Sequence, residues 1–333
     1  MRDDTFDVMK GSEIQDRNLS IDLIKIVAML GVISLHCNMD RLDNPIAFVL
    51  SRMAGISIPL FFMVSGYLLF NKQANYHYSA RKIFGILKFV FICSFCYWIF
   101  QMIYHREFNL NVVYIFSRAF IQKGFFWMFW YFGSMCLIYA LLPLLKKCDI
   151  KYHLFYPKLL GVLVCLDFVI FILTYQFHFE YSIIQTFRLW NWLTYFSMGV
   201  IIRKYNIPSI GSFPVILISM LLFISFVYYC KETIDGVEYF FTTPLCMMYA
   251  FLLFNYMKSI NVTNSTIVGN LSKLFLPVYT LHYLIIKVYH HSINTQYAGV
   301  FTPLVDYLII TTITVMLCYI IMRIPFSEKV FKI

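Results

Sequence analysis

The chain has 333 residues, of which 60% are apolar and only 13% are charged. A soluble domain carries about 25% charged residues, so a soluble protein of this length is excluded because it could not cover its surface with polar groups. The formal net charge of +10 would fit nucleic-acid binding, but the basic residues stand in short clusters between apolar runs. That distribution is typical of a membrane protein, and no nucleic-acid partner is expected.

Ten apolar segments follow one another along the chain, most of them near the roughly 20 residues needed to cross a bilayer. They lie near residues 20–38, 46–70, 84–104, 125–145, 155–176, 187–203, 213–230, 238–257, 271–289 and 304–322. The sixth is the weakest, because it is short and contains Arg188 and Asn191. Segment 112–121 is too short to cross and is expected to lie in the membrane interface. The predicted fold class is all-α, a polytopic transmembrane helical bundle of about ten helices.

The basic residues of the loops predict the orientation. Sixteen Lys and Arg lie on the side of the N-terminus and five on the opposite side. Cytoplasmic loops carry the excess of positive charge, so both termini are predicted to be cytoplasmic. Residues 1–18 are polar and mixed in charge, unlike a signal peptide. The predicted division is a cytoplasmic segment at 1–18, a membrane domain at 19–323 and a cytoplasmic tail at 324–333.

The first apolar segment contains three side chains that are costly in lipid: Asp22, Lys25 and His36. Such residues are functional candidates by default. Lys25 and His36 are eleven residues apart, which on a helix puts them about 20° out of phase and about 16 Å apart along the axis. Asp22 is expected to form an ion pair with Lys25. The alternative roles are snorkelling to the surface for Lys25 and a plain interfacial position for His36.

Three further polar side chains stand within apolar segments. Arg52 enters the second segment at a depth similar to that of His36, and would either steady an oxyanion or acceptor, or anchor the helix at the interface. His282 lies in the middle of the ninth segment, where a second catalytic role and a structural hydrogen bond between helices are equally consistent. Asp167 in the fifth segment has no assigned role. No metal site is predicted, since the Cys93 and Cys96 pair lies in an apolar helix without a second ligand pair.

Four segments resemble the bacterial membrane acyltransferases of acyltransferase family 3. The opening RNLSIDLIKIVAMLGVISLH resembles the family's first-helix pattern of Asp, a basic residue, ten residues and His. RMAGISIPLFFMVSGYLLF is similar to its Pro-Leu-Phe-Phe-x-x-Ser-Gly-Tyr segment. FWYFGSMCLIYALLPLL matches a Trp, then Tyr139 and Pro143, and GNLSKLFLPVYTLHYLI matches Gly269, Ser272, Tyr279 and His282. The order of the four segments is also that of the family.

The resemblance implies an O-acyltransferase in the bacterial cytoplasmic (inner) membrane. Its donor would be cytoplasmic acyl-CoA, most simply acetyl-CoA, with no permanently bound cofactor. Its acceptor would be a hydroxyl of a surface polysaccharide such as O-antigen, or of a lipid-linked sugar precursor. His36 would be the general base, with an acyl-histidine intermediate as an open alternative. Lys25, Arg52 and His282 are the other catalytic candidates.

Basic side chains at the cytoplasmic end of the helical bundle would bind the phosphates of CoA: Arg17, Lys25, Arg81 and Lys82. Two departures from the family weaken this expectation. Lys25 stands where the family usually has arginine, which keeps the charge but loses the bidentate fork, and Gly85 stands where a further arginine is common.

A transporter or flippase of lipid-linked sugars is the main alternative, because it also needs buried charges and a polar cavity. A non-catalytic polysaccharide-assembly protein is a weaker one. Dependence on an acyl-CoA donor distinguishes them, since a transporter needs no acyl-CoA.

Overall fold

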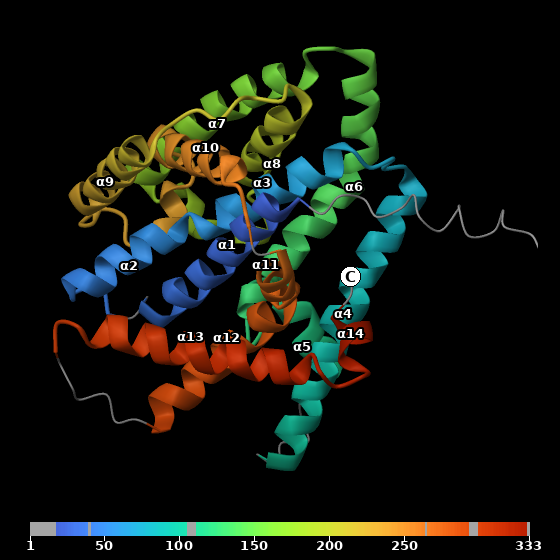
Figure 1. Cartoon of the computed structure of the whole chain (residues 1–333), viewed down its shortest axis with the longest axis vertical. Helices are drawn as coiled ribbons and strands as arrows, with labels where there is room; N and C mark the ends of the chain where they lie inside the picture. The colour runs from blue at the N-terminus through green and yellow to red at the C-terminus, as the bar shows by residue number, and fades with distance from the viewer. Residues whose placement is uncertain (1–17, 39–40, 105–110, 264, 293–298, 332–333) are drawn as a thin grey trace, which may run out of the picture.

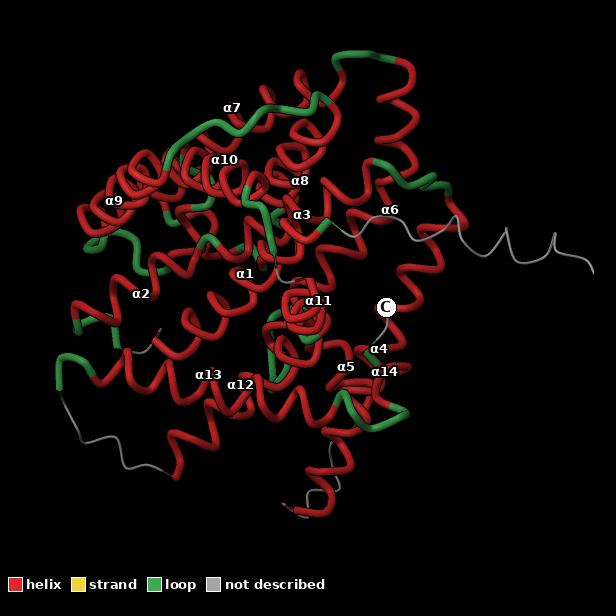
Figure 2. Tube along the Cα trace, viewed as in Figure 1, coloured by secondary structure: helices red, strands yellow, loops and turns green. Residues whose placement is uncertain are grey.

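The structure is a computed structural model that describes residues 18–38, 41–104, 111–263, 265–292 and 299–331. Throughout these ranges the regular secondary structure is helical, and none of it is strand (Figure 2). An α-helix satisfies its backbone hydrogen bonds internally, which lipid requires because it offers no partners. The predicted all-helical class is confirmed.

Seven helical segments of the described chain are long and apolar enough to cross a membrane. They are α1 (Leu19–Asn38), α2 with α3 (Pro45–Gly55 and Ser57–Phe70), α4 (Tyr76–Tyr104), α6 (Trp130–Lys151), α7 (Phe155–Phe177), α9 (Phe213–Cys230) and α13 (Thr302–Ile321). An eighth is present if α11 (Ser265–Lys273) and α12 (Phe275–Ser292), which are bent by 57°, form one span.

Two of the ten expected spans are shorter helices than a full crossing needs. The segments near 187–203 and 238–257 form α8 (Leu189–Lys204) and α10 (Pro244–Ser259), each of 16 residues. A count of about ten spans is therefore not confirmed. The remaining described helices are α5 (Val112–Phe120), α14 (Ser327–Val330) and the 3₁₀ turns η2 (Trp127–Phe129), η3 (Phe179–Ser182), η4 (Gln185–Phe187) and η5 (Val237–Phe240).

Proline explains the two breaks in the long helical segments. Pro59 and Pro277 each stand at the third residue of the second helix of a pair. Proline has no N–H to donate to the carbonyl oxygen of the residue four positions earlier. That residue is Gly55 for Pro59 and Lys273 for Pro277, and each is the last residue of the preceding helix. The helix therefore stops and restarts at these two points, and at the second of them it changes direction by 57°.

Helix α1 runs through the middle of the bundle (Figure 1). It contacts α2 and α3 on one side and α11, α12 and α13 on another, and it also touches α10. A helix enclosed by other helices meets protein rather than lipid, so its polar side chains have partners available. This explains how the first helix tolerates Asp22, Lys25 and His36.

The tightest packing joins α3 to α8. An added Cβ on Gly66 would lie 2.0 Å from the carbonyl oxygen of Phe196, and one on Gly199 would lie 1.9 Å from that of Met63. Small residues allow two backbones to approach this closely, as is common between membrane helices. Trp192 on α8 is fully buried between Phe62 and Trp130. Helix α8 is thus a buried core helix rather than a lipid-facing span.

Candidate active site

The structure brings together two histidines that are 246 residues apart in the sequence. His36 stands near the end of α1 and His282 lies in the middle of α12. Nδ1 of His36 is 2.7 Å from Nε2 of His282, and the two rings are nearly parallel, with 13° between their planes. His282 is fully buried, whereas His36 is half-buried. His36 is therefore the accessible member of the pair.

The hydrogen bonds of His282 determine which nitrogens carry protons. Its Nδ1 lies 3.0 Å from the carbonyl oxygen of Val278, which can only accept. A neutral His282 therefore carries its proton on Nδ1 and presents a lone pair at Nε2. The proton between the two rings then belongs to Nδ1 of His36. This leaves Nε2 of His36 with its lone pair, which is the state that a general base requires.

Aromatic rings surround the histidine pair. The Trp127 ring centroid is 5.0 Å from that of His36, and the Tyr283 centroid is 6.4 Å away. Trp127 and Tyr283 also contact each other edge to face at 5.8 Å. These rings limit the motion of the His36 side chain and present an apolar wall beside it.

A cavity lies at the start of α12. Its volume is about 310 Å³, and residues of α3, α4, α6, the α11–α12 break and the C-terminal segment line it: Ser65, Ile86, Tyr131, Phe132, Met135, Tyr139, Ser272, Lys273, Phe275, Leu276 and Phe331. Phe331 also packs on Phe89 of α4 at 5.9 Å. Phe331, which belongs to the segment expected to be a tail, thus helps to close this cavity.

Tyr279 stands between the cavity and the histidine pair. Its ring centroid is 5.8 Å from that of Tyr131, which lines the cavity, and 6.0 Å from that of His282. Its hydroxyl donates to the carbonyl oxygen of Met128. The cavity, Tyr279 and the histidine pair therefore form one continuous region of contacts through the bundle.

Lys25 forms the expected ion pair with Asp22, with 3.1 Å between Nζ and Oδ1. The side chain of Lys25 remains 28% exposed, and that of Asp22 is 5% exposed. Helix α1 is unbroken from Leu19 to Asn38, so the separation of about 16 Å between Lys25 and His36 expected from the helical rise holds. Lys25 therefore lies toward the opposite end of the helix from the histidine pair.

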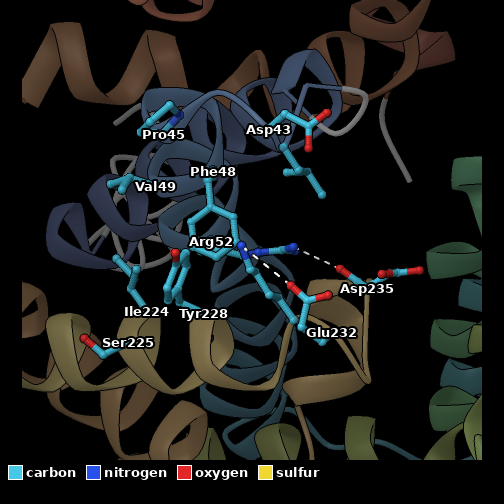
Figure 3. Close-up of a pocket in the computed structure, with 12 residues that line it drawn as sticks. Asp43, Pro45, Phe48, Val49, Arg52, Ile224, Ser225, Tyr228, Glu232 and Asp235 are labelled. Carbon is cyan, nitrogen blue, oxygen red and sulfur yellow. Dashed lines mark hydrogen bonds and ion pairs between the residues drawn. The ribbon is translucent and has the colours of Figure 1, made fainter.

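Arg52 does not join the histidine pair. It is 3% exposed and lines a separate pocket, with Nη2 donating to the Asp235 carbonyl oxygen at 2.9 Å (Figure 3). Helix α2 contacts the Ser34 side of α1, where the Ser34 hydroxyl reaches the carbonyl oxygen of Leu50. His36, two residues on, points about 200° away around the helix. The similar depth expected for Arg52 is thus not accompanied by a shared site.

The remaining basic candidates lie at the start of α4. Arg81 is exposed and Lys82 is half-buried. The positive charges of Lys72 and Arg81 lie close enough to Lys82 to repel its ammonium group, so the three form a local concentration of positive charge. Arg17 lies outside the described residues. Among the described residues, no three His, Cys, Asp or Glu side chains lie together in a way that could hold a metal ion.

Two buried polar clusters were missed by sequence reasoning. Asp306 on α13 binds Arg41 at 2.5 Å and accepts from the Tyr289 hydroxyl at 2.7 Å. The sequence does contain a signal for Asp306, because a carboxylate in the apolar segment 304–322 is as unusual as a histidine in the first apolar segment.

The second cluster lies beside α8. Glu180 in η3 is fully buried and accepts from Trp190 Nε1 at 3.2 Å, with Arg188 3.9 Å away. Asp167, which had no role, accepts from the Thr194 hydroxyl at 2.6 Å.

Three comparisons with known proteins bear on the family to which the chain belongs. No curated protein and no solved structure matches the chain. Residues 18–323, by contrast, match a protein-family model described as an acyltransferase domain. This match covers nearly the whole chain, so the protein belongs to acyltransferase family 3.

Proposed function

We propose that the protein transfers an acyl group, most simply acetyl, from cytoplasmic acyl-CoA to a hydroxyl of a surface polysaccharide or its lipid-linked precursor. In this proposal it resides in the bacterial inner membrane with both termini in the cytoplasm, and α8 and α10 complete a set of about ten membrane segments. Family membership supports acyl transfer in general. The charge pattern of the loops supports the orientation.

The observation that carries the proposal is the pair of contacts that His282 makes: its Nδ1 lies 3.0 Å from the Val278 carbonyl oxygen and its Nε2 lies 2.7 Å from Nδ1 of His36. A sugar hydroxyl is a weak nucleophile at neutral pH, so a base must remove its proton as it attacks the thioester carbonyl. With His282 protonated on Nδ1 toward the Val278 carbonyl, the proton between the rings belongs to Nδ1 of His36, and Nε2 of His36 presents the required lone pair. The attack forms a tetrahedral adduct of the sugar oxygen and the thioester carbon. This adduct breaks its carbon–sulfur bond and expels the CoA thiolate, which takes the proton from the His36 imidazolium. The acyl group ends on the sugar oxygen and CoA leaves as a thiol.

His282 acts through His36 in this scheme. Its lone pair at Nε2 holds the His36 ring in place and stabilises the positive charge that forms as His36 accepts a proton. The arrangement corresponds to the carboxylate that orients the histidine of a serine-hydrolase triad, with a neutral imidazole in place of the carboxylate.

The donor would enter from the cytoplasmic end. Lys25, Arg81, Lys82 and Arg17 are the proposed partners of the CoA phosphates, because ammonium and guanidinium groups form charge-assisted hydrogen bonds with phosphate. The cavity of about 310 Å³ is the proposed place for the pantetheine arm, since it is lined mostly by apolar and aromatic side chains and adjoins Tyr279. The thioester would then reach His36 past Tyr279.

The test is acyl transfer by His36 variants. Membrane vesicles containing the protein are given radiolabelled acetyl-CoA and the surface glycan from a strain that lacks the gene. His36→Ala and His36→Gln should each lose about 10²–10⁴-fold of the transfer, the usual contribution of a general base. The matched control is His291→Ala, an exposed histidine near the end of α12. Normal transfer by His36→Ala, with normal protein accumulation, would refute the assignment, and glycan handling that needs no acyl-CoA would favour a transporter.

A further inference from the structure

A large pocket lies on the opposite side of α1 from the histidine pair. Its volume is about 710 Å³, within the range of ligand sites. It lies between α2 with the two residues Leu42 and Asp43 before it, the end of α9 and the segment that follows α9 (Figure 3). Its lining is Leu42, Asp43, Pro45, Phe48, Val49, Arg52, Ile224, Ser225, Tyr228, Lys231, Glu232 and Asp235. The mechanism above uses none of these residues.

Arg52 is the buried charge of this pocket. Its guanidinium lies 4.9 Å from the centroid of the Phe48 ring, and Nη2 donates to the Asp235 backbone carbonyl. Its Nε is buried and has no hydrogen-bond partner among the described residues. Within the same part of the chain no carboxylate comes within 4.0 Å of it. A buried donor without a partner is costly, so a bound ligand with an acceptor oxygen would compensate it.

The mixed charges of the lining favour a neutral ligand over a strongly charged one. Asp43, Glu232 and Asp235 carry negative charge, whereas Arg52 and Lys231 carry positive charge. An anion would meet three carboxylates at the exposed rim, and a cation would meet the buried Arg52 guanidinium. A neutral ligand with several hydroxyl groups satisfies both, because each hydroxyl both donates and accepts.

Aromatic surface completes the pocket. Tyr228 is 57% exposed, and its ring lies edge to face with Phe48 at 5.7 Å. Lys231 Nζ lies 4.5 Å from the centroid of the Tyr228 ring, on one of its faces. The part of the ring that stays exposed offers an apolar surface for the C–H groups of a sugar, and the neighbouring carboxylates offer acceptors for its hydroxyls. Carbohydrate therefore fits this lining better than lipid or phosphate.

We propose that this pocket binds a sugar residue of the acceptor glycan at a distance from the hydroxyl that reacts. The proposal rests on the acyl transfer proposed above. His36 stands two residues before the end of α1, and the pocket is lined from residue 42 onward, so both lie at the same end of the bundle on two sides of α1. A glycan of several sugars would contact both, with one residue held in the pocket and another presented to Nε2 of His36.

The experiment measures binding without the reaction. The probe is an oligosaccharide fraction of the surface glycan from a strain that lacks the gene. It is titrated by calorimetry into the purified full-length protein in lipid nanodiscs, with no acyl-CoA present. Tyr228→Ala removes the exposed ring and Arg52→Gln removes the buried charge. Each should weaken binding about tenfold or more, the loss expected for one good contact of a ligand with such groups.

Tyr229→Ala is the matched control, because Tyr229 is the next residue, is 82% exposed and does not line the pocket. It should bind as the unmodified protein does. The pocket proposal is overturned if the unmodified protein does not bind the probe, or if Tyr228→Ala binds as tightly as Tyr229→Ala. Tyr228 is a surface residue, so this comparison stands even if Arg52→Gln fails to fold. Binding that Tyr228→Ala weakens, in a protein that never transfers acetyl, would support the pocket and refute the acyl transfer alone.

Discussion

His282 should affect the reaction only through His36, and three substitutions test this. His282→Leu removes the lone pair that accepts from His36 Nδ1. His282→Gln places an amide oxygen close to the position of Nε2, so the hydrogen bond of 2.7 Å can form again. The double variant His36→Ala with His282→Leu removes both rings.

The expected loss follows from how the hydrogen bond changes during the reaction. In the ground state the bond joins two neutral rings and contributes about 0.5–1.5 kcal/mol, whereas a bond to a charged group contributes about 1.5–3 kcal/mol. His36 becomes charged as it accepts the proton, so the bond strengthens by about 1–2 kcal/mol in the transition state. Each 1.36 kcal/mol is about a factor of ten in rate, so His282→Leu should lower kcat by about 5–30-fold. Loss of the correct tautomer adds to this figure.

The assay is steady-state transfer of radiolabelled acetyl to the glycan, with protein quantity measured by immunoblot. His282→Leu should lower kcat and leave KM for acetyl-CoA unchanged, because His282 contacts His36 and not the CoA phosphates. His282→Gln should recover most of the rate. The double variant should be no slower than His36→Ala alone, because His282 has no role once His36 is absent.

Several results would refute this reasoning. Equal rates for the Gln and Leu variants would show that the accepted hydrogen bond is unimportant. A double variant much slower than His36→Ala would give His282 an independent role in the reaction. Wild-type kcat in His282→Leu would remove His282 from the mechanism entirely.

Two further predictions concern stability and are both measured as apparent unfolding midpoints by differential scanning fluorimetry. Burial raises the pKa of Glu180 to about 7, and the charge of Arg188 opposes this shift. The ordinary pKa of a glutamate is about 4.3, so between about pH 4 and 7 the folded state holds a proton on Glu180 that the unfolded state releases. The free energy of unfolding should therefore fall as pH rises from about 4 to about 7, and Glu180→Gln should flatten this dependence; an unchanged slope in the variant would contradict it. Gly199→Val should lower the midpoint, with a cost of at least about 1–3 kcal/mol, because an added Cβ meets the Met63 backbone. Gly161→Ala on α7 has nothing within 4 Å of its Cβ and should not lower it, and equal midpoints for both glycine variants would argue against the close packing of α3 and α8.

The sequence alone was enough to predict the features that depend on neighbouring residues. Long apolar runs determine where helices form, because each residue must avoid water and satisfy its backbone within the helix. The Asp22–Lys25 ion pair was also predictable, since residues three apart lie on one face of a helix. The family resemblance rested on local segments as well, and it identified the His36 and His282 positions individually.

Only tertiary packing decided which of these residues meet. His36 and His282 lie on helices far apart in the sequence, and nothing local indicates that Nδ1 of one reaches Nε2 of the other. Arg52 shows the opposite outcome. Its depth could be estimated by counting residues, but its direction depends on which side of α1 packs against α2. The apolar segment at 187–203 likewise indicated a helix that avoids water, and close packing of Gly199 against α3 shows that protein rather than lipid surrounds most of α8. A hydrophobic segment must avoid water, and either lipid or a protein core meets that requirement. The neighbouring helices therefore decide which of the two surrounds each segment.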